Sequence, residues 1–179
     1  MKTARRGFTL IEIMIVIAII GVLSSIVLAS LGPARMKARD ARRIEDLHEI
    51  NNALALYYSD HHEYPPSPCG YDCNGYYYSF DNYDSASWSI LQTYLAPYLS
   101  KLPVDPINSN CQPWSDGCYS YSYGNVGRIN NKPQYDLTAQ LEDPNNPDRC
   151  AVQQYTFYFN SQPWCAAGGY STHIYEASN

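Results

Sequence analysis

The chain has 179 residues and a formal net charge of −5, with 12 Lys and Arg against 17 Asp and Glu. This length allows one modest domain plus a membrane segment. Residues 60–179 carry 4 of the bases and 12 of the acids, so they offer no basic patch for nucleic-acid phosphates. DNA binding by this part alone is therefore not expected.

The first predicted element is an apolar helix over residues 8–31, in which Glu12 is the only charged residue. At about 1.5 Å per residue the helix spans about 36 Å, enough to cross a hydrocarbon core of about 30 Å. A secretory signal peptide cleaved after Ala29 is one explanation, but the apolar run is longer than such signals need. A plain membrane anchor explains the length but gives no reason for the acid.

The helix is expected to continue past Gly32 and Pro33 as an amphipathic stem over residues 32–59. Apolar residues recur there at three- and four-residue steps, which predicts one buried face: Ile44, Leu47, Ile50, Leu54 and Tyr57. The stem is basic over residues 35–43 and acidic over 45–49. These charges form either a solvated face or two bands that meet between staggered copies of the chain.

Residues 60–179 are expected to form a globular head. Trp88, Leu91, Leu95 and Leu99 indicate a short helix that Pro97 limits. Alternating apolar positions predict strands around residues 119–123, 135–141 and 155–159, with loops over 103–118 and 142–152. Most of the 18 tyrosines are expected to pack in the core and the sheet, with a hydrogen-bond partner for each buried hydroxyl.

All six cysteines follow the apolar run, which is typical of a domain in an oxidising compartment: Cys69, Cys73, Cys111, Cys118, Cys150 and Cys165. The in-order pairs 69–73, 111–118 and 150–165 close short loops and are expected first. Free thiols or a zinc site are the alternatives. The spacing of residues 69–73 is CxxxC, without a second matching pair, and does not favour zinc.

The stretch Arg6-Gly-Phe-Thr-Leu-Ile-Glu12, followed by an unbroken apolar helix, resembles the cleavage signal of type IV pilins and type II secretion pseudopilins. Three later stretches are similar to the stem, the stem exit and the LPxDP turn of the major-pseudopilin-like branch: Asp40–Leu47, Tyr64–Pro66 and Leu102–Pro106. The resemblance covers residues 1–66 well and residues 88–106 moderately.

This resemblance implies an α+β pilin fold, in which a long N-terminal helix packs its second half on a small antiparallel sheet. Residues 1–7 would be a leader peptide and residues 8–31 a transmembrane and filament-core helix. Residues 32–59 would be the stem, and residues 60–179 an extracytoplasmic head with disulfide-pinned loops.

The resemblance also implies a processing site. A prepilin peptidase would cut between Gly7 and Phe8 and then methylate the new amine of Phe8. Glu12 would pair with that amine in a neighbouring copy and so fix the register of assembly. The implied partners are copies of the chain, the peptidase, an inner-membrane assembly platform with its ATPase, and membrane lipid before assembly.

The function expected first is a structural subunit of a type IV pilus-like filament, serving adhesion, motility or DNA uptake. The alternative within the family is a type II secretion pseudopilin. An alternative of another class is a monomeric, single-span binding protein that keeps its leader. The chain is expected in the cytoplasmic membrane with its N-terminus in the cytoplasm, and then in an extracellular or periplasmic filament.

An enzyme is not expected, because the sequence contains no GxSxG, HExxH, P-loop or GxGxxG motif. Asp143, Asn145 and Asp148 are weak calcium candidates, since carboxylate and amide oxygens are calcium ligands and the major pseudopilin has a calcium loop near its C-terminus. Two prolines among them favour an ordinary polar loop. No other cofactor is expected.

Overall fold

The structure is a computed structural model that describes residues 7–68, 75–80, 88–113, 115, 117–129, 132–149 and 174–176. Within these described ranges, two helices and four strands follow one another in the order α1, β1, α2, β2, β3, β4. Their bounds are Leu10–His61 for α1, Tyr76–Tyr78 for β1, Trp88–Leu95 for α2, Tyr121–Ile129 for β2, Lys132–Gln140 for β3 and Ile174–Glu176 for β4.

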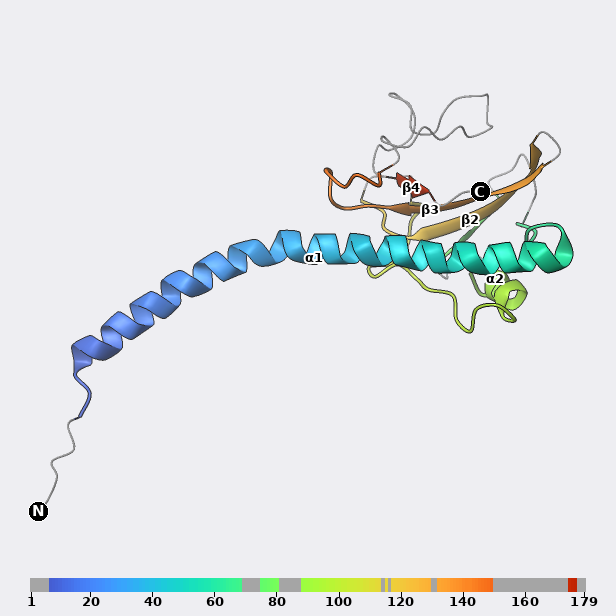
Figure 1. Ribbon diagram of the computed structural model, residues 1–179. Coiled ribbons are helices and arrows are strands. Elements are labelled where there is room, and N and C mark those ends of the chain that lie inside the picture. The colour runs from blue at the N-terminus through green and yellow to red at the C-terminus, as the bar shows by residue number, and fades with distance from the viewer. Residues whose placement is uncertain are drawn as a thin grey trace, which may run out of the picture.

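Helix α1 is one continuous rod of 52 residues, with Pro33 inside it. The first half extends away from the other elements along a gentle bow, and the second half lies against the sheet and α2 (Figure 1). The helix ends where His62 adopts a left-handed conformation, with φ of 58°, and donates its N–H to the carbonyl of Tyr58. The prediction of an unbroken helix through Gly32 and Pro33 is confirmed.

The four strands form one antiparallel sheet in the order β1-β2-β3-β4. Pairing of Tyr123 with Leu137 places alternate side chains of β2 and β3 on one face. The two central strands confirm the predictions around residues 119–123 and 135–141. The three-residue strands β1 and β4 were not predicted, and the strand expected at 155–159 lies outside the described residues.

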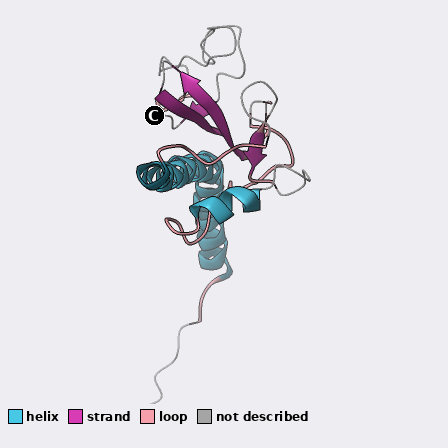
Figure 2. Cartoon of the chain, turned by 90° about the vertical axis from the view of Figure 1, so that its right-hand side faces the viewer, coloured by secondary structure: helices cyan, strands magenta, loops and turns pink. Residues whose placement is uncertain are grey.

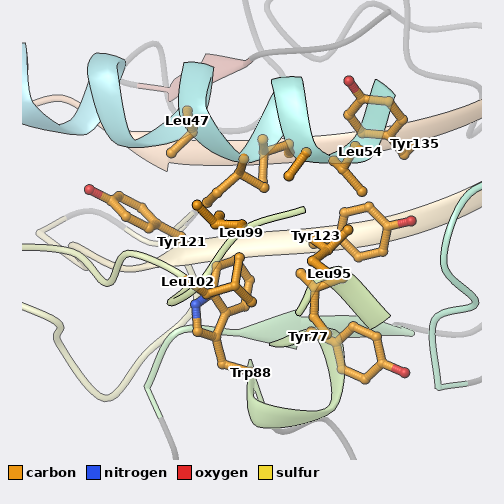
Figure 3. Packing of buried hydrophobic residues seen from close by; sticks show 14 of the residues in the cluster. Leu47, Leu54, Tyr77, Trp88, Leu95, Leu99, Leu102, Tyr121, Tyr123 and Tyr135 are labelled. Carbon is orange, nitrogen blue, oxygen red and sulfur yellow. The ribbon is translucent and has the colours of Figure 1, made fainter. Parts of the chain in front are cut away.

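Both helices lie on the same side of the sheet (Figure 2). The core fills the space between them and the sheet face that carries Tyr123, and Figure 3 shows side chains of α1, α2, β1, β2 and β3 meeting there. Its fully buried members are Leu47, Ile50, Leu54, Leu91, Leu95, Tyr121, Tyr123, Leu137, Ala139 and Leu141. Long helix, small antiparallel sheet and shared core confirm the α+β pilin-like fold class.

Buried tyrosine hydroxyls find partners, as expected. Tyr121 donates to the carboxylate of Asp46 at 2.7 Å, and Tyr123 donates to the carbonyl of Pro65 at 2.7 Å. Tyr135 donates to the side-chain amide oxygen of Asn51 on α1. These bonds tie the sheet to the stem and to the segment that follows it.

Candidate functional site

The first half of α1 presents an apolar surface with no cover from the rest of the described chain. Every described side chain from Phe8 to Leu31 is exposed. The mean hydropathy of the most apolar 18-residue window is 2.8, so by length and composition this helix can cross a membrane. Such a surface needs either lipid or other apolar helices around it.

Glu12 helps to cap the N-terminus of this helix. Its backbone N–H donates to the hydroxyl of Thr9 at 3.4 Å, and its carboxylate accepts the backbone N–H and the hydroxyl of Thr9, each at 2.7 Å. This reciprocal arrangement is a capping box, which satisfies N–H groups that a helix leaves open at its start. Within one chain, the partner of Glu12 is therefore Thr9.

Gly7 and Phe8 precede the helix and lie outside regular structure. Phe8 is 82% exposed, and no other atom lies within 4 Å of where a Cβ on Gly7 would stand. A protease reads an extended backbone, so this stretch has the accessibility that cleavage needs. Residues 1–6 of the expected leader lie outside the described residues.

The most connected polar site lies where α1 meets the head, around Arg43. The guanidinium is fully buried and binds Asp105 from the LPxDP turn, with Nε to Oδ2 at 2.6 Å and Nη2 to Oδ1 at 3.2 Å. Its Nη1 donates to Asp40 at 2.9 Å and to Glu142, after β3, at 2.6 Å. The ring of Tyr119 covers the guanidinium at 4.7 Å.

Two further sets of bonds extend this Arg43 cluster. Arg39 forms a two-pronged ion pair with Glu142, at 2.6 Å from Nε and 2.5 Å from Nη2. The two carboxylate oxygens of Asp40 accept the backbone N–H groups of Glu142 and Asp143, both at 2.8 Å. The cluster thus joins the stem, the LPxDP turn and the segment after β3.

The charges of the cluster hold one another in the ionised state. Burial opposes charge on Arg43, but hydrogen bonds and charges of Asp105 and Glu142 outweigh it and raise the pKa of Arg43. Burial also acts to raise the pKa of Glu142, yet its hydrogen bonds with Arg39 and Arg43 outweigh that effect and lower it. The arginines therefore carry their charge at any physiological pH.

For Arg43 and Asp46 the expectation of a solvated stem face is wrong, because both are buried, as is Asp40 beside Arg43. Arg42 and Glu45, by contrast, are exposed. The sequence contains a signal for this difference: residues 40 and 43 lie seven and four positions before Leu47, on the same helical face, so they point at the head. Exposed stem charges remain for contacts between copies.

Cys111 and Cys118 form a disulfide, the second of the three expected pairs. Gln140 of β3 fills the loop that this bridge closes: its amide donates to the carbonyls of Pro113 and Ser115 at 2.9 and 3.0 Å, and its oxygen accepts the N–H of Gly117 at 2.8 Å. Cys69, Cys73, Cys150 and Cys165 lie outside the described residues.

Two of the three calcium candidates, Asp143 and Asp148, take part in local hydrogen bonds of the loop after β3. Asp143 uses one carboxylate oxygen to accept the N–H of Asn145 at 2.9 Å, and Asp148 donates its N–H to the side chain of Asn146 at 3.0 Å. These are local turns of the kind that Asp and Asn form in polar loops. Across the described residues, no group of three or more His, Cys, Asp or Glu side chains could hold a metal ion.

Comparisons with known proteins agree with the geometry of α1. A family model described as the prokaryotic N-terminal methylation motif matches residues 2–28. The type II secretion system core protein G of Aeromonas hydrophila is 30% identical over 128 residues, which is 72% of this chain and 80% of that protein. Its counterpart in Klebsiella pneumoniae is 34% identical over 113 residues, 63% of this chain and 76% of that protein.

A fimbrial protein of Neisseria meningitidis serogroup B is 38% identical over 65 residues, 36% of this chain and 38% of that protein. No solved structure gives a significant match to the chain. The similarity to the secretion proteins is thus the more extensive of the two.

Proposed function

Because this chain belongs to the family of type IV pilins and type II secretion pseudopilins, we propose that it is a filament subunit with a structural role rather than a catalytic one. The observation that carries the proposal is α1, whose exposed apolar half is joined without a break to a folded head. Lipid covers this surface before assembly, and the helices of other copies cover it in the filament.

Among filaments of this family, a type II secretion pseudopilus fits best. This differs from the pilus-like filament expected first from the sequence. An alignment of 128 residues with the secretion protein must run well past His61, where α1 ends, and so includes part of the head. The alignment with the fimbrial protein is about half as long, at 65 residues.

Cleavage of the leader creates the N-terminal amine of Phe8, which assembly uses. A prepilin peptidase cuts between Gly7 and Phe8 on the cytoplasmic side and methylates the amine of Phe8, while the head lies on the other side of the membrane. An assembly platform with its ATPase then moves the subunit from the bilayer into the filament. The N-terminal amine of the processed subunit is a cation at the start of a helix, and the apolar surroundings have a low dielectric constant.

Glu12 is the anion that pairs with this amine on a neighbouring copy. A carboxylate deep in a membrane costs roughly 2.5–3.5 kcal/mol on insertion scales, and the capping box offsets part of that cost within one chain. A carboxylate accepts several hydrogen bonds at once, so Glu12 can bind a neighbouring amine without releasing Thr9. A buried pair of this kind makes one register preferable to others.

The test is to co-express the full chain with a prepilin peptidase and the type II secretion assembly proteins, and to examine sheared envelope material by electron microscopy. Filaments that contain the chain are expected, short and anchored in the envelope. Long filaments reaching far beyond the cell surface would favour the pilus instead. Monomers that keep Met1 and never form filaments would contradict a filament role altogether.

A further inference from the structure

Charged side chains, rather than the apolar core, determine where α1 leaves the head. Among the described side chains from residue 8 to residue 43, Asp40 and Arg43 are the only buried ones. The first buried apolar side chain of the helix is Leu47. Nearer to Leu47, Ile44 packs partly on the core and Asp46 accepts the hydroxyl of Tyr121. The turns over residues 36–43 therefore depend on the Arg43 cluster for their attachment to the head.

The chain segment after β3 lies beside these turns without packing tightly on them. An open groove lies between the two segments, and its lining residues are Pro33, Met36 and Lys37 of α1 and Asp143, Asn145, Asn146 and Pro147 of the loop. Next to the groove, the carboxylate of Asp40 accepts the N–H groups of Glu142 and Asp143. Hydrogen bonds and ion pairs thus attach this part of α1 to the segment after β3. We expect the loss of a single charged group to weaken this attachment.

Arg43 suits this position because its planar guanidinium reaches several carboxylates at once. It binds Asp105 through Nε and Nη2, and Asp40 and Glu142 through Nη1. A lysine offers one compact charge and cannot make all these contacts. Removal of one partner leaves a buried charge without compensation, which is far more disruptive than loss of a surface ion pair.

We propose that Asp40, Arg43, Asp105 and Glu142 form an ionic latch that fixes the direction in which α1 leaves the head, and thereby positions its apolar half for packing into the filament. The positioning part rests on the proposed function. When the latch opens, the core around Leu47 stays folded, while the turns over residues 36–43 detach from the head and lose their fixed direction.

Hydrogen–deuterium exchange on the full chain in detergent micelles tests the latch itself. Glu142→Gln removes one carboxylate, and Arg43→Lys keeps the charge but loses the planar fork. Glu45→Gln is the matched control, because Glu45 is an exposed acid on the same stem. In both latch variants we expect amides of residues 36–43 to exchange at least roughly tenfold faster, with a much smaller increase over residues 47–57.

Two results would overturn the latch. One is exchange over residues 36–43 that stays as slow as in the control. The other is faster exchange that extends equally to residues 47–57 and to β2, because the cluster would then merely stabilise the whole head. If a latch variant does not fold, Arg39→Gln gives a milder opening, since it removes one partner of Glu142 and leaves Arg43 in place.

Filament yield tests the positioning role. The latch variants are expected to accumulate in the membrane like the control and to yield several-fold fewer filaments. Normal filaments from chains whose residues 36–43 exchange quickly would overturn that role. Should the unmodified chain form no filaments, the proposed function fails, whereas the exchange result still decides whether the latch exists.

Discussion

At the scale of single residues, Glu12 caps α1, and substitutions can separate this role from the charge pairing that we propose for it. Glu12→Gln keeps an oxygen that can accept the Thr9 N–H and loses the charge, whereas Glu12→Ala loses both. Pairing with the Phe8 amine needs the charge, so both variants should insert into the membrane normally and yield at least several-fold fewer filaments. Immunoblots of membrane and sheared fractions measure both quantities.

The two variants also distinguish the roles. Glu12→Ala should in addition lose the N3 half of the capping box at the start of the helix, seen as faster amide exchange over residues 10–13. Filaments at the normal level from Glu12→Gln would show that capping, and not charge pairing, is what assembly requires of this position.

Gly124 is a second position at which a single substitution should change stability, because the ring of Tyr76 leaves no room for a side chain. It pairs with Tyr76 across β1 and β2, and a Cβ at Gly124 would lie 2.5 Å from the tyrosine ring. The ring cannot move freely, because the hydroxyl of Tyr76 donates to Asp136 at 2.8 Å. We expect Gly124→Ala to lower the free energy of unfolding by about 1–3 kcal/mol.

Thermal unfolding of the full chain in detergent measures this effect, and Tyr76→Ala provides the control background. In that background the alanine has no ring to displace, so Gly124→Ala should cost much less. An equal cost with and without the ring would mean that the backbone conformation, rather than the contact with Tyr76, requires the glycine.

The sequence predicts some residues of the site better than others. Gly7, Phe8 and Glu12 lie within a short motif, so sequence alone singles them out. The Arg43 cluster combines residues separated by 62 and 99 positions along the chain, Asp105 and Glu142, and no local pattern announces such a meeting. The helical face shared by Asp40, Arg43 and Leu47 was the one available hint.

At the scale of elements, regular periodicity made α1, α2 and the two central strands predictable. Leu47, Ile50 and Leu54 recur at helical spacing and are all fully buried. Strands β1 and β4 have three residues each, too few to show alternation, and their pairing with β2 and β3 defines them. Tertiary pairing rather than local preference forms these edges.

The joint between α1 and the head should weaken in acid because of Glu142. Arg39 and Arg43 lower the pKa of Glu142 below its ordinary value near 4.5 despite burial. A carboxyl group with a lowered pKa stabilises the fold above its unfolded pKa, and this stability is lost as pH falls through the folded pKa. The free energy of unfolding of the unmodified chain should therefore decrease once the pH drops below about 4.5.

Urea unfolding of the full chain at several pH values measures this contribution, and Glu142→Gln isolates it. The variant should be less stable than the unmodified chain at pH 7, and the two should converge as pH falls below about 4.5. Asp46, whose pKa burial raises, is common to both proteins and cancels in the comparison. A stability difference that stays constant across this pH range would contradict the assignment.

The loop after β3 should not depend on calcium. Its Asp143 and Asn146 side chains already accept backbone N–H groups within the loop. We therefore expect the melting temperature of the full chain to change by less than about 1 °C when calcium is replaced by a chelator, since only a ligand that binds the folded state shifts it. A melting temperature that rises with calcium concentration would instead support calcium binding by Asp143, Asn145 and Asp148.

At the scale of the whole molecule, α1 joins an exposed apolar surface in its first half to the folded part of the head that the structure describes. Composition and the N-terminal motif made this division predictable from sequence. The choice between pilus and pseudopilus was not, because both use the same helix and differ in the head, where the resemblance weakens after residue 106. The longer alignment with the secretion proteins shifted that choice.

The central claim is that the chain is cut after Gly7 and functions from Phe8 onward. Mass spectrometry of the mature N-terminus, on protein from cells that contain a prepilin peptidase, tests it most directly. If the peptidase acts as proposed, the mature chain begins at Phe8 and carries one methyl group on its amine. A chain that keeps Met1, or one that begins at Ser30 after cleavage by a signal peptidase, would contradict it.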